Sequence, residues 1–183
     1  MITGLGNPGK SYSLTRHNVG FRCVNLLARR HDIAINKRQS RAHVGLGHIC
    51  DHDVVLAKPK TFMNLSGGAV SLLARRYKVG PAGILIIHDD LDLSLARIRV
   101  YHDGGSGGHR GVESVVRELG TSDFMRVRIG VGRPPDGYDP VEYVLSDFNS
   151  QEQPLIDETI ARAADAVECL LREGASVAMN RFN

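Results

Sequence analysis

The chain has 183 residues, 42% of them hydrophobic, and a formal net charge of +3 at pH 7. This length is enough for one well-buried core, and no Pro-, Gly- or Ser-rich linker divides the chain, so we expect a single domain over residues 1–183. The 3 cysteines lack the short paired spacing of a zinc site or a disulfide framework, which fits a reducing cytoplasm. The sequence has neither a charged-then-apolar leader nor a run of about 18 apolar residues, so it predicts no export and no membrane insertion.

Short apolar runs alternate with helical periodicity along the chain, which predicts an α/β fold with a central mixed, partly parallel sheet flanked by helices. The expected strands are Met1–Thr3, Ala42–Gly47, Val54–Ala57, Ile84–His88, Arg97–Tyr101 and Arg126–Gly130. The expected helices are Asn18–His31, Leu65–Tyr77, Gly108–Leu119 and Gln151–Glu173. Ser150 and Gln153 occupy the positions of a capping box at the start of the last helix.

The first polar motif, Gly4-Leu-Gly-Asn-Pro-Gly9, directly follows the first expected strand. Its glycines match the G-x-G-x-x-G pattern of dinucleotide-binding loops. That pattern needs its third glycine inside a starting helix, whereas Pro8 keeps this segment in a loop and helical periodicity begins only near Asn18. The spacing therefore favours a tight loop that presents the Asn7 amide, with a purely structural turn as the alternative.

A histidine and a group of acids follow in two further motifs. His17 stands in Thr15-Arg-His-Asn18, between the first loop and the first helix. The segment His88-Asp-Asp-Leu-Asp92 ends a buried apolar strand, which is where α/β folds place their sites. An acid at that edge can orient an imidazole, so the two motifs together predict a catalytic histidine. Two alternatives stay open: the carboxylates bind a divalent metal ion, or they serve as helix caps and solvated turns.

The segment Thr61-Phe-Met-Asn-Leu-Ser-Gly67 precedes the second helix. An N-cap role for Asn64 or Ser66 accounts for much of its polarity. Phe62 and Met63, two large apolar residues beside an asparagine, also suit a pocket for an amide-bearing ligand. Packing of these two side chains in the core is the equal alternative.

Glycine and arginine dominate the next part of the chain. The segment Asp103-Gly-Gly-Ser-Gly-Gly-His-Arg-Gly111 is either a mobile flap or a loop whose amides hold an anion with the help of Arg110. It lacks the Gly-Lys-Ser/Thr ending of a P-loop, so it does not predict cleavage of nucleoside triphosphates. The following strand places Arg126 and Arg128 on one face, as a solvated edge or as a phosphate contact. An anionic partner is favoured by the arginines of this stretch: Arg97, Arg99, Arg110, Arg117, Arg126, Arg128 and Arg133.

These motifs, in this order and over nearly the whole chain, resemble those of the bacterial-type peptidyl-tRNA hydrolase family. The resemblance implies a monomeric α/β enzyme of the cytoplasm that needs no metal and no other cofactor. It implies that the partner is peptidyl-tRNA, and that the enzyme cuts the ester between the peptide and the ribose. The tRNA lost from stalled ribosomes is thereby recycled.

Carried over motif by motif, the resemblance also implies roles for single residues. His17 matches the general base, Asp89 the acid that holds it, and Asn7 the residue that distinguishes N-blocked from free aminoacyl-tRNA. The implied substrate contacts are Tyr12, Phe62 and Asn64, with Met63 beside them in the same motif.

Arg128 matches a residue implied to contact the 5′ phosphate of tRNA. Two positions depart from the family pattern. The family usually has asparagine where this chain has Arg110, and a basic residue where it has Tyr101, so that nearby Arg99 is the candidate tRNA contact there. Because a guanidinium donates hydrogen bonds and cannot accept them, we expect Arg110 to turn toward tRNA phosphate or toward Asp103.

The residues support this reaction on chemical grounds as well. An ester is activated enough for a water molecule, deprotonated by a neutral imidazole, to attack it directly. No serine or cysteine lies in a convincing nucleophile motif, so we expect no covalent intermediate. Two other classes of function remain. A non-catalytic RNA-binding protein of this fold is disfavoured by the presence of His17, Asp89 and Asn7, and a metal-dependent phosphoesterase would use Asp89, Asp90 and Asp92.

Overall fold

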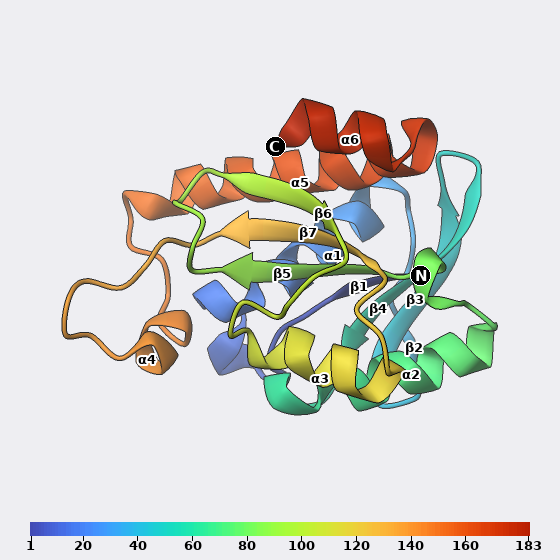
Figure 1. Ribbon diagram of the computed structural model, residues 1–183, viewed down its shortest axis with the longest axis horizontal. Helices are drawn as coiled ribbons and strands as arrows, with labels where there is room; N and C mark the ends of the chain where they lie inside the picture. The colour runs from blue at the N-terminus through green and yellow to red at the C-terminus, as the bar shows by residue number, and fades with distance from the viewer.

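The computed structural model describes all residues from Met1 to Asn183 and has a mixed sheet of seven strands at its centre (Figure 1). The strands follow the order β2-β3-β4-β1-β5-β7-β6 across the sheet. The pairs among β4, β1, β5 and β7 are parallel, and the other pairs are antiparallel. The expected fold class is therefore confirmed. The strand bounds are β1 Ile2–Gly4, β2 Lys37–Gln39, β3 Ala42–Ile49, β4 His52–Pro59, β5 Leu85–Asp90, β6 Ile98–His102 and β7 Met125–Gly130.

Helices cover both faces of the sheet. α1, α5 and α6 pack on one face, whereas α2 and α3 pack on the other. The short helix α4 stands apart from both layers, at the far end of a long loop (Figure 1). None of the helices combines the length and the apolar character needed to cross a bilayer. The helix bounds are α1 Val19–Arg30, α2 Ser66–Tyr77, α3 Arg110–Leu119, α4 Pro140–Val144, α5 Glu152–Glu173 and α6 Ala175–Phe182.

The central strand β5 is buried on both faces. Leu85 and Ile87 belong to the apolar cluster under α1 and α5, whereas Ile86 belongs to the cluster under α2 and α3. A strand enclosed in this way reads as a continuous apolar run, which is why it is easily recognised in the sequence. The run ends with His88 and Asp89, which remain buried at the carboxyl edge of the sheet. Polar side chains are thus enclosed where β5 stops.

The start of α1 touches this edge directly. A Cβ atom at Gly20 would lie 2.4 Å from the carbonyl oxygen of Ile87, and one at Gly4 would lie 2.1 Å from the carbonyl oxygen of Gly20. No side chain fits at such distances, so the two glycines allow an approach that other residues would prevent. The 3-10 turn Arg16–Asn18, which leads into α1, is thereby held beside the end of β5.

The start of α2 differs from the expectation. A 3-10 turn, Met63–Leu65, precedes the helix, and no side chain of this segment caps it, so the expected N-cap by Asn64 or Ser66 is wrong. Instead, the hydroxyl of Ser114 on α3 accepts a hydrogen bond from the Gly67 amide at 3.0 Å. The partner comes from another helix, which the local sequence does not reveal.

The capping box of α5 lies one position earlier than expected. The Asn149 side chain accepts hydrogen bonds from the amides of Gln151 and Glu152, both at 2.9 Å, and Glu152 accepts one from the Asn149 amide at 2.9 Å. The box is therefore Asn149 with Glu152, and the expectation of Ser150 with Gln153 is wrong.

The solvated edge considered for Arg126 and Arg128 is also wrong, because β7 lies between β5 and β6.

Candidate active site

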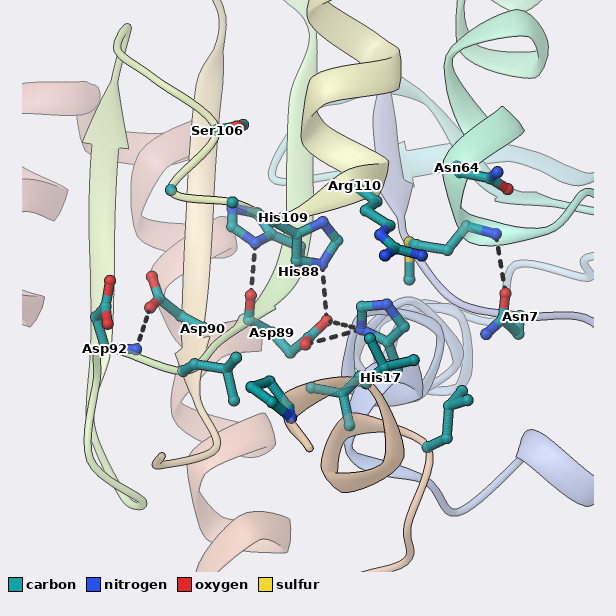
Figure 2. Close-up of a pocket in the computed structure, with 18 of the residues that line it drawn as sticks. Asn7, His17, Asn64, His88, Asp89, Asp90, Asp92, Ser106, His109 and Arg110 are labelled. Atoms are coloured by element: carbon teal, nitrogen blue, oxygen red, sulfur yellow. Dashed lines mark hydrogen bonds and ion pairs between the residues drawn. The ribbon is translucent and has the colours of Figure 1, made fainter. Parts of the chain in front are cut away.

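A cavity of about 610 Å³ opens at the carboxyl ends of β1 and β5 (Figure 2). Its walls come from the loop after β1, the turn before α1, the segment before α2, the end of β5, the glycine-rich loop and α4. The cavity brings together seven of the predicted site residues: Asn7, His17, Phe62, Met63, Asn64, Asp89 and Arg110. Tyr12, Arg99 and Arg128 lie outside its lining.

His17 and Asp89 form a hydrogen-bonded pair on the cavity floor. The Nδ1 atom of His17 lies 2.9 Å from Oδ1 and 2.8 Å from Oδ2 of Asp89, whose side chain is buried. Burial by itself lowers the pKa of His17, but the charge and hydrogen bond of Asp89 outweigh it, so that the pKa is raised overall. The pKa of Asp89 stays well below its usual range because His17 and His109 outweigh its desolvation. The carboxylate is therefore ionised beside an imidazole that it stabilises in the charged form.

His109 is the second partner of Asp89. Its Nδ1 accepts hydrogen bonds from the amides of Gly111 and Val112, at 3.1 and 3.2 Å, and so caps α3. A ring nitrogen that accepts carries no proton, so the hydrogen-bond network assigns the proton to Nε2, which donates to Oδ1 of Asp89 at 2.9 Å. Nδ1 of His17 faces only the carboxylate oxygens of Asp89 and is therefore a donor, and no protein group hydrogen-bonds to its Nε2.

His109 is not among the site residues predicted from the sequence. The available signal was its place directly before a helix that follows a glycine-rich loop, which is the place of an N-cap. Histidine is not a usual cap, and the distance to Asp89 depends on how α3 packs on the sheet.

His88 fixes the backbone next to Asp89. Its Nδ1 donates to the carbonyl oxygen of Asp89 at 2.7 Å, whereas its Nε2 has no partner. Burial lowers the pKa of His88 well below the ordinary value. The ring is therefore neutral, and it meets the His109 ring edge-on with 4.7 Å between centroids. His88 is a support for the pair and contributes no charge.

Asn7 presents a free amide group to the cavity. Its backbone exchanges two hydrogen bonds with the Asn18 side chain, at 2.8 and 3.0 Å, and its Oδ1 accepts one from the Met63 amide at 2.9 Å (Figure 2). These contacts orient the side chain and leave Nδ2 as a donor without a protein partner. Asn18, which is not among the site residues predicted from the sequence, thus holds Asn7 in place.

The remaining wall residues differ in burial. Phe62 is 61% exposed and Asn64 is exposed, so both form the rim, whereas Met63 is buried in the core under α2 and α3. Arg110 is exposed on the wall and forms no ion pair. Its expected turn toward Asp103 is wrong, because Asp103 accepts from Ser122 at 2.5 Å and from the Gly104 amide at 2.6 Å.

The three acids of the His88–Asp92 segment do not form a cluster. Asp90 pairs with Arg128 and Asp92 pairs with Arg133, while Asp89 holds its two histidines. Each carboxylate therefore has its own partners, and this arrangement does not provide the shared oxygen ligands of a phosphoesterase centre. One other group has metal-ligating atoms within 4.8 Å of one another, namely His17, Asp89 and His109, and both histidines of this group already hydrogen-bond to Asp89.

The glycine-rich loop is anchored from the sheet. Arg126 is buried and donates to the carbonyl oxygens of Gly104 and Gly105, both at 2.7 Å. Since His109 already occupies the amides of Gly111 and Val112, these amides at the start of α3 are not free for an anion. Arg126 therefore serves the loop, and the phosphate contact considered for it finds no support.

The predicted tRNA contacts lie on the adjacent part of the sheet. Arg99 of β6 is exposed and stands opposite Arg128 of β7 in the antiparallel register. Two cations thus lie side by side just outside the cavity, near Asp90. Tyr12 lies in the 3-10 turn Lys10–Tyr12 after the Asn7 loop and is half-buried.

Comparisons with known proteins show the family of this chain. The family model described as peptidyl-tRNA hydrolase matches residues 1–183. The peptidyl-tRNA hydrolase of Chloroflexus aurantiacus is 47% identical over 184 residues, covering 100% of this chain and 98% of that protein. That of Mycobacterium marinum is 49% identical over 185 residues, covering 100% and 96%. The crystal structure of peptidyl-tRNA hydrolase from Acinetobacter baumannii has a TM-score of 0.94 at 40% identity, covering 100% of this chain and 93% of that one. The resemblance of the motifs is confirmed, and the chain belongs to the peptidyl-tRNA hydrolase family.

Proposed function

We propose that this chain hydrolyses the ester between a peptide, or an N-blocked aminoacyl group, and the ribose of tRNA, with His17 as the general base. The observation that carries the proposal is the His17 imidazole, which is bound to Asp89 through Nδ1 and keeps a free Nε2 at the cavity. A neutral imidazole with a fixed tautomer beside an ionised acid is the arrangement that general-base catalysis needs.

The reaction follows from these atoms. Nε2 of His17 removes a proton from a water molecule, and the oxygen of that water attacks the ester carbonyl. The resulting tetrahedral oxyanion is stabilised by hydrogen-bond donors at the cavity, for which the side-chain amides of Asn7 and Asn64 are the candidates. The intermediate then expels the ribose oxygen, which takes the proton back from Nε2. Asp89 stabilises the imidazolium between these two proton transfers.

Asn7 also explains a preference for blocked substrates. The amide of a peptide or of an N-acyl group has a carbonyl oxygen that can accept a hydrogen bond from the free Nδ2 of Asn7. A free aminoacyl group has an ammonium at that place, which only donates and carries charge. We therefore propose that Asn7 selects peptidyl-tRNA, with Phe62, Met63 and Asn64 lining the peptide side of the cavity and Tyr12 as a more distant contact.

We further propose that Arg99 and Arg128 bind phosphates of the tRNA, since they lie side by side outside the cavity. Such contacts position a nucleic acid without reading its sequence. Acting as a monomer, the protein would then return tRNA from stalled translation to use.

The test is release of the acyl group from N-acetylaminoacyl-tRNA by the purified protein with a chelator present. We expect turnover of this substrate and little of unblocked aminoacyl-tRNA. His17→Ala should reduce turnover roughly 10²–10⁴-fold while tRNA binding is retained. His48→Ala, in an exposed hairpin, is the matched control and should behave as wild type. Binding of tRNA without hydrolysis would instead support the non-catalytic RNA-binding function.

A further inference from the structure

Arg16 directly precedes His17, and its side chain is enclosed by protein groups outside the cavity lining. The residue is 5% exposed. The guanidinium carbon lies 4.3 Å from the ring centre of Tyr143 and 4.5 Å from that of Phe148. Its Nη2 donates to Oε2 of Glu152 at 2.6 Å. A buried planar cation is thus held by two aromatic faces and one carboxylate.

The two aromatic partners, Tyr143 and Phe148, lie in the segment that connects β7 to α5, and Glu152 is the first residue of α5. Residues 131–150, here called the arm, leave β7, carry α4 and return to α5 (Figure 1). Nη1 of Arg16 donates to the carbonyl oxygen of Val131 at 3.5 Å. The backbone amide of Arg16 donates to the carbonyl oxygen of Ser146 at 3.0 Å. A single residue therefore contacts the beginning, the middle and the end of the arm.

The arm supplies the apolar wall of the cavity. Pro140, Val141, Val144 and Leu145 all line it, and Val141 and Leu145 are 41% and 38% exposed. Apolar walls of this kind contribute much of the contact in binding pockets, while a few polar groups fix orientation. Because α4 stands apart from the two helix layers, the position of this wall depends on what holds the arm.

We propose that Arg16 is a positioning residue that fixes the arm, so that the apolar wall lies where the substrate needs it beside His17. This inference rests on the proposed function. Lysine would keep the positive charge, but it lacks the planar fork that stacks on two rings and meets a carboxylate at once. Arg16→Lys should therefore loosen the arm and leave the His17–Asp89 pair intact.

Two measurements test this inference, with Arg30→Lys as the matched control. Arg30 also joins a carboxylate on α5, donating to Asp165 at 2.7 Å, and forms no hydrogen bond with the arm. In Arg16→Lys, amide hydrogen exchange over residues 133–147 should be roughly tenfold faster or more, with β5 and α1 unchanged. The KM for N-acetylaminoacyl-tRNA should rise roughly tenfold, with kcat and the acid limb of its pH profile nearly unchanged.

A fall in kcat with KM intact, or a shifted acid limb, would show that Arg16 acts on His17 and would overturn the inference. Equal exchange in the two lysine variants would overturn it too. Should Arg16→Lys fail to fold, Tyr143→Leu and Tyr143→Phe take its place. Both lose the Tyr143 hydroxyl, which donates to the carbonyl oxygen of Val131 at 3.0 Å, but only leucine also removes the face on which Arg16 stacks. Tyr143→Leu should therefore show the pattern, more weakly than Arg16→Lys, and equal exchange in the two Tyr143 variants would overturn the inference. Hydrogen exchange needs no turnover, so it decides the role of Arg16 even where the proposed hydrolysis is absent.

Discussion

His109 donates to Asp89 with one ring nitrogen and caps α3 with the other. The acid that orients His17 is therefore itself oriented by the start of a helix. Neither oxygen of Asp89 is free, since Oδ1 faces both histidines and Oδ2 faces His17. The His17–Asp89 pair is thus tied to the packing of α3 on the sheet, and a change at the glycine-rich loop can reach the proposed base without touching the substrate.

Replacement of His109 separates these two contacts. Asparagine can still cap α3 but is too short to reach Asp89, so His109→Asn should keep stability and lower kcat. His109→Ala loses both contacts and should also lower the free energy of unfolding by about 0.5–2 kcal/mol. Urea unfolding and kcat measured on both variants check this. Equal kcat in His109→Asn and wild type would show that Asp89 does not need its second donor.

Asp89→Asn should change both the rate and its pH dependence. Burial lowers the pKa of His17 and Asp89 raises it, so loss of the carboxylate charge lowers the pKa. The proposed mechanism requires a neutral imidazole at His17, so the acid limb of the kcat profile should move to lower pH while the plateau falls. The pH profile of kcat between pH 4 and 9 measures this. A plateau that falls without movement of the acid limb would mean that Asp89 orients the ring without affecting its charge.

Arg110→Asn should move the acid limb in the opposite direction. The charge of Arg110 is among the causes that lower the pKa of His17, so its removal raises that pKa and shifts the limb to higher pH. At high pH and saturating substrate we expect kcat to be preserved, with weaker tRNA binding at low salt. The pH profile and filter binding check both parts. A collapse of turnover with intact affinity would place Arg110 in the chemistry.

Arg128→Ala should flatten the salt dependence of tRNA affinity. Each lost phosphate contact reduces the slope of log K against log salt by about one. Asp90→Asn removes the carboxylate that now pairs with Arg128, and should strengthen binding at low salt. Arg76→Ala, on the exposed face of α2, is the control with an unchanged slope. An unchanged slope for Arg128→Ala would remove this residue from the tRNA interface.

The sequence predicts what local patterns encode. The apolar run of β5 followed by acids, and a histidine before α1, were enough to predict that an acid at this edge orients His17, and the resemblance to the family identified that acid as Asp89. His109, Asn18 and Ser114 were missed because their partners come from distant segments, at distances set by packing. β2, α4 and α6 are short, and their patterns are too brief to stand out.

The close approach of α1 to the sheet has a consequence for engineering thermal stability. Replacing a helical glycine by alanine usually stabilises a protein by about 0.4–1 kcal/mol, because the unfolded chain loses freedom. Gly20 and Gly68 both lie in helices, yet a methyl group at Gly20 would meet the carbonyl oxygen of Ile87, whereas one at Gly68 would meet nothing within 4 Å. Gly68→Ala should therefore stabilise the protein without a clash. Gly20→Ala would push α1 outward and draw His17 away from Asp89. The stability gained from the reduced freedom of the unfolded chain would then be offset by the clash in the folded one.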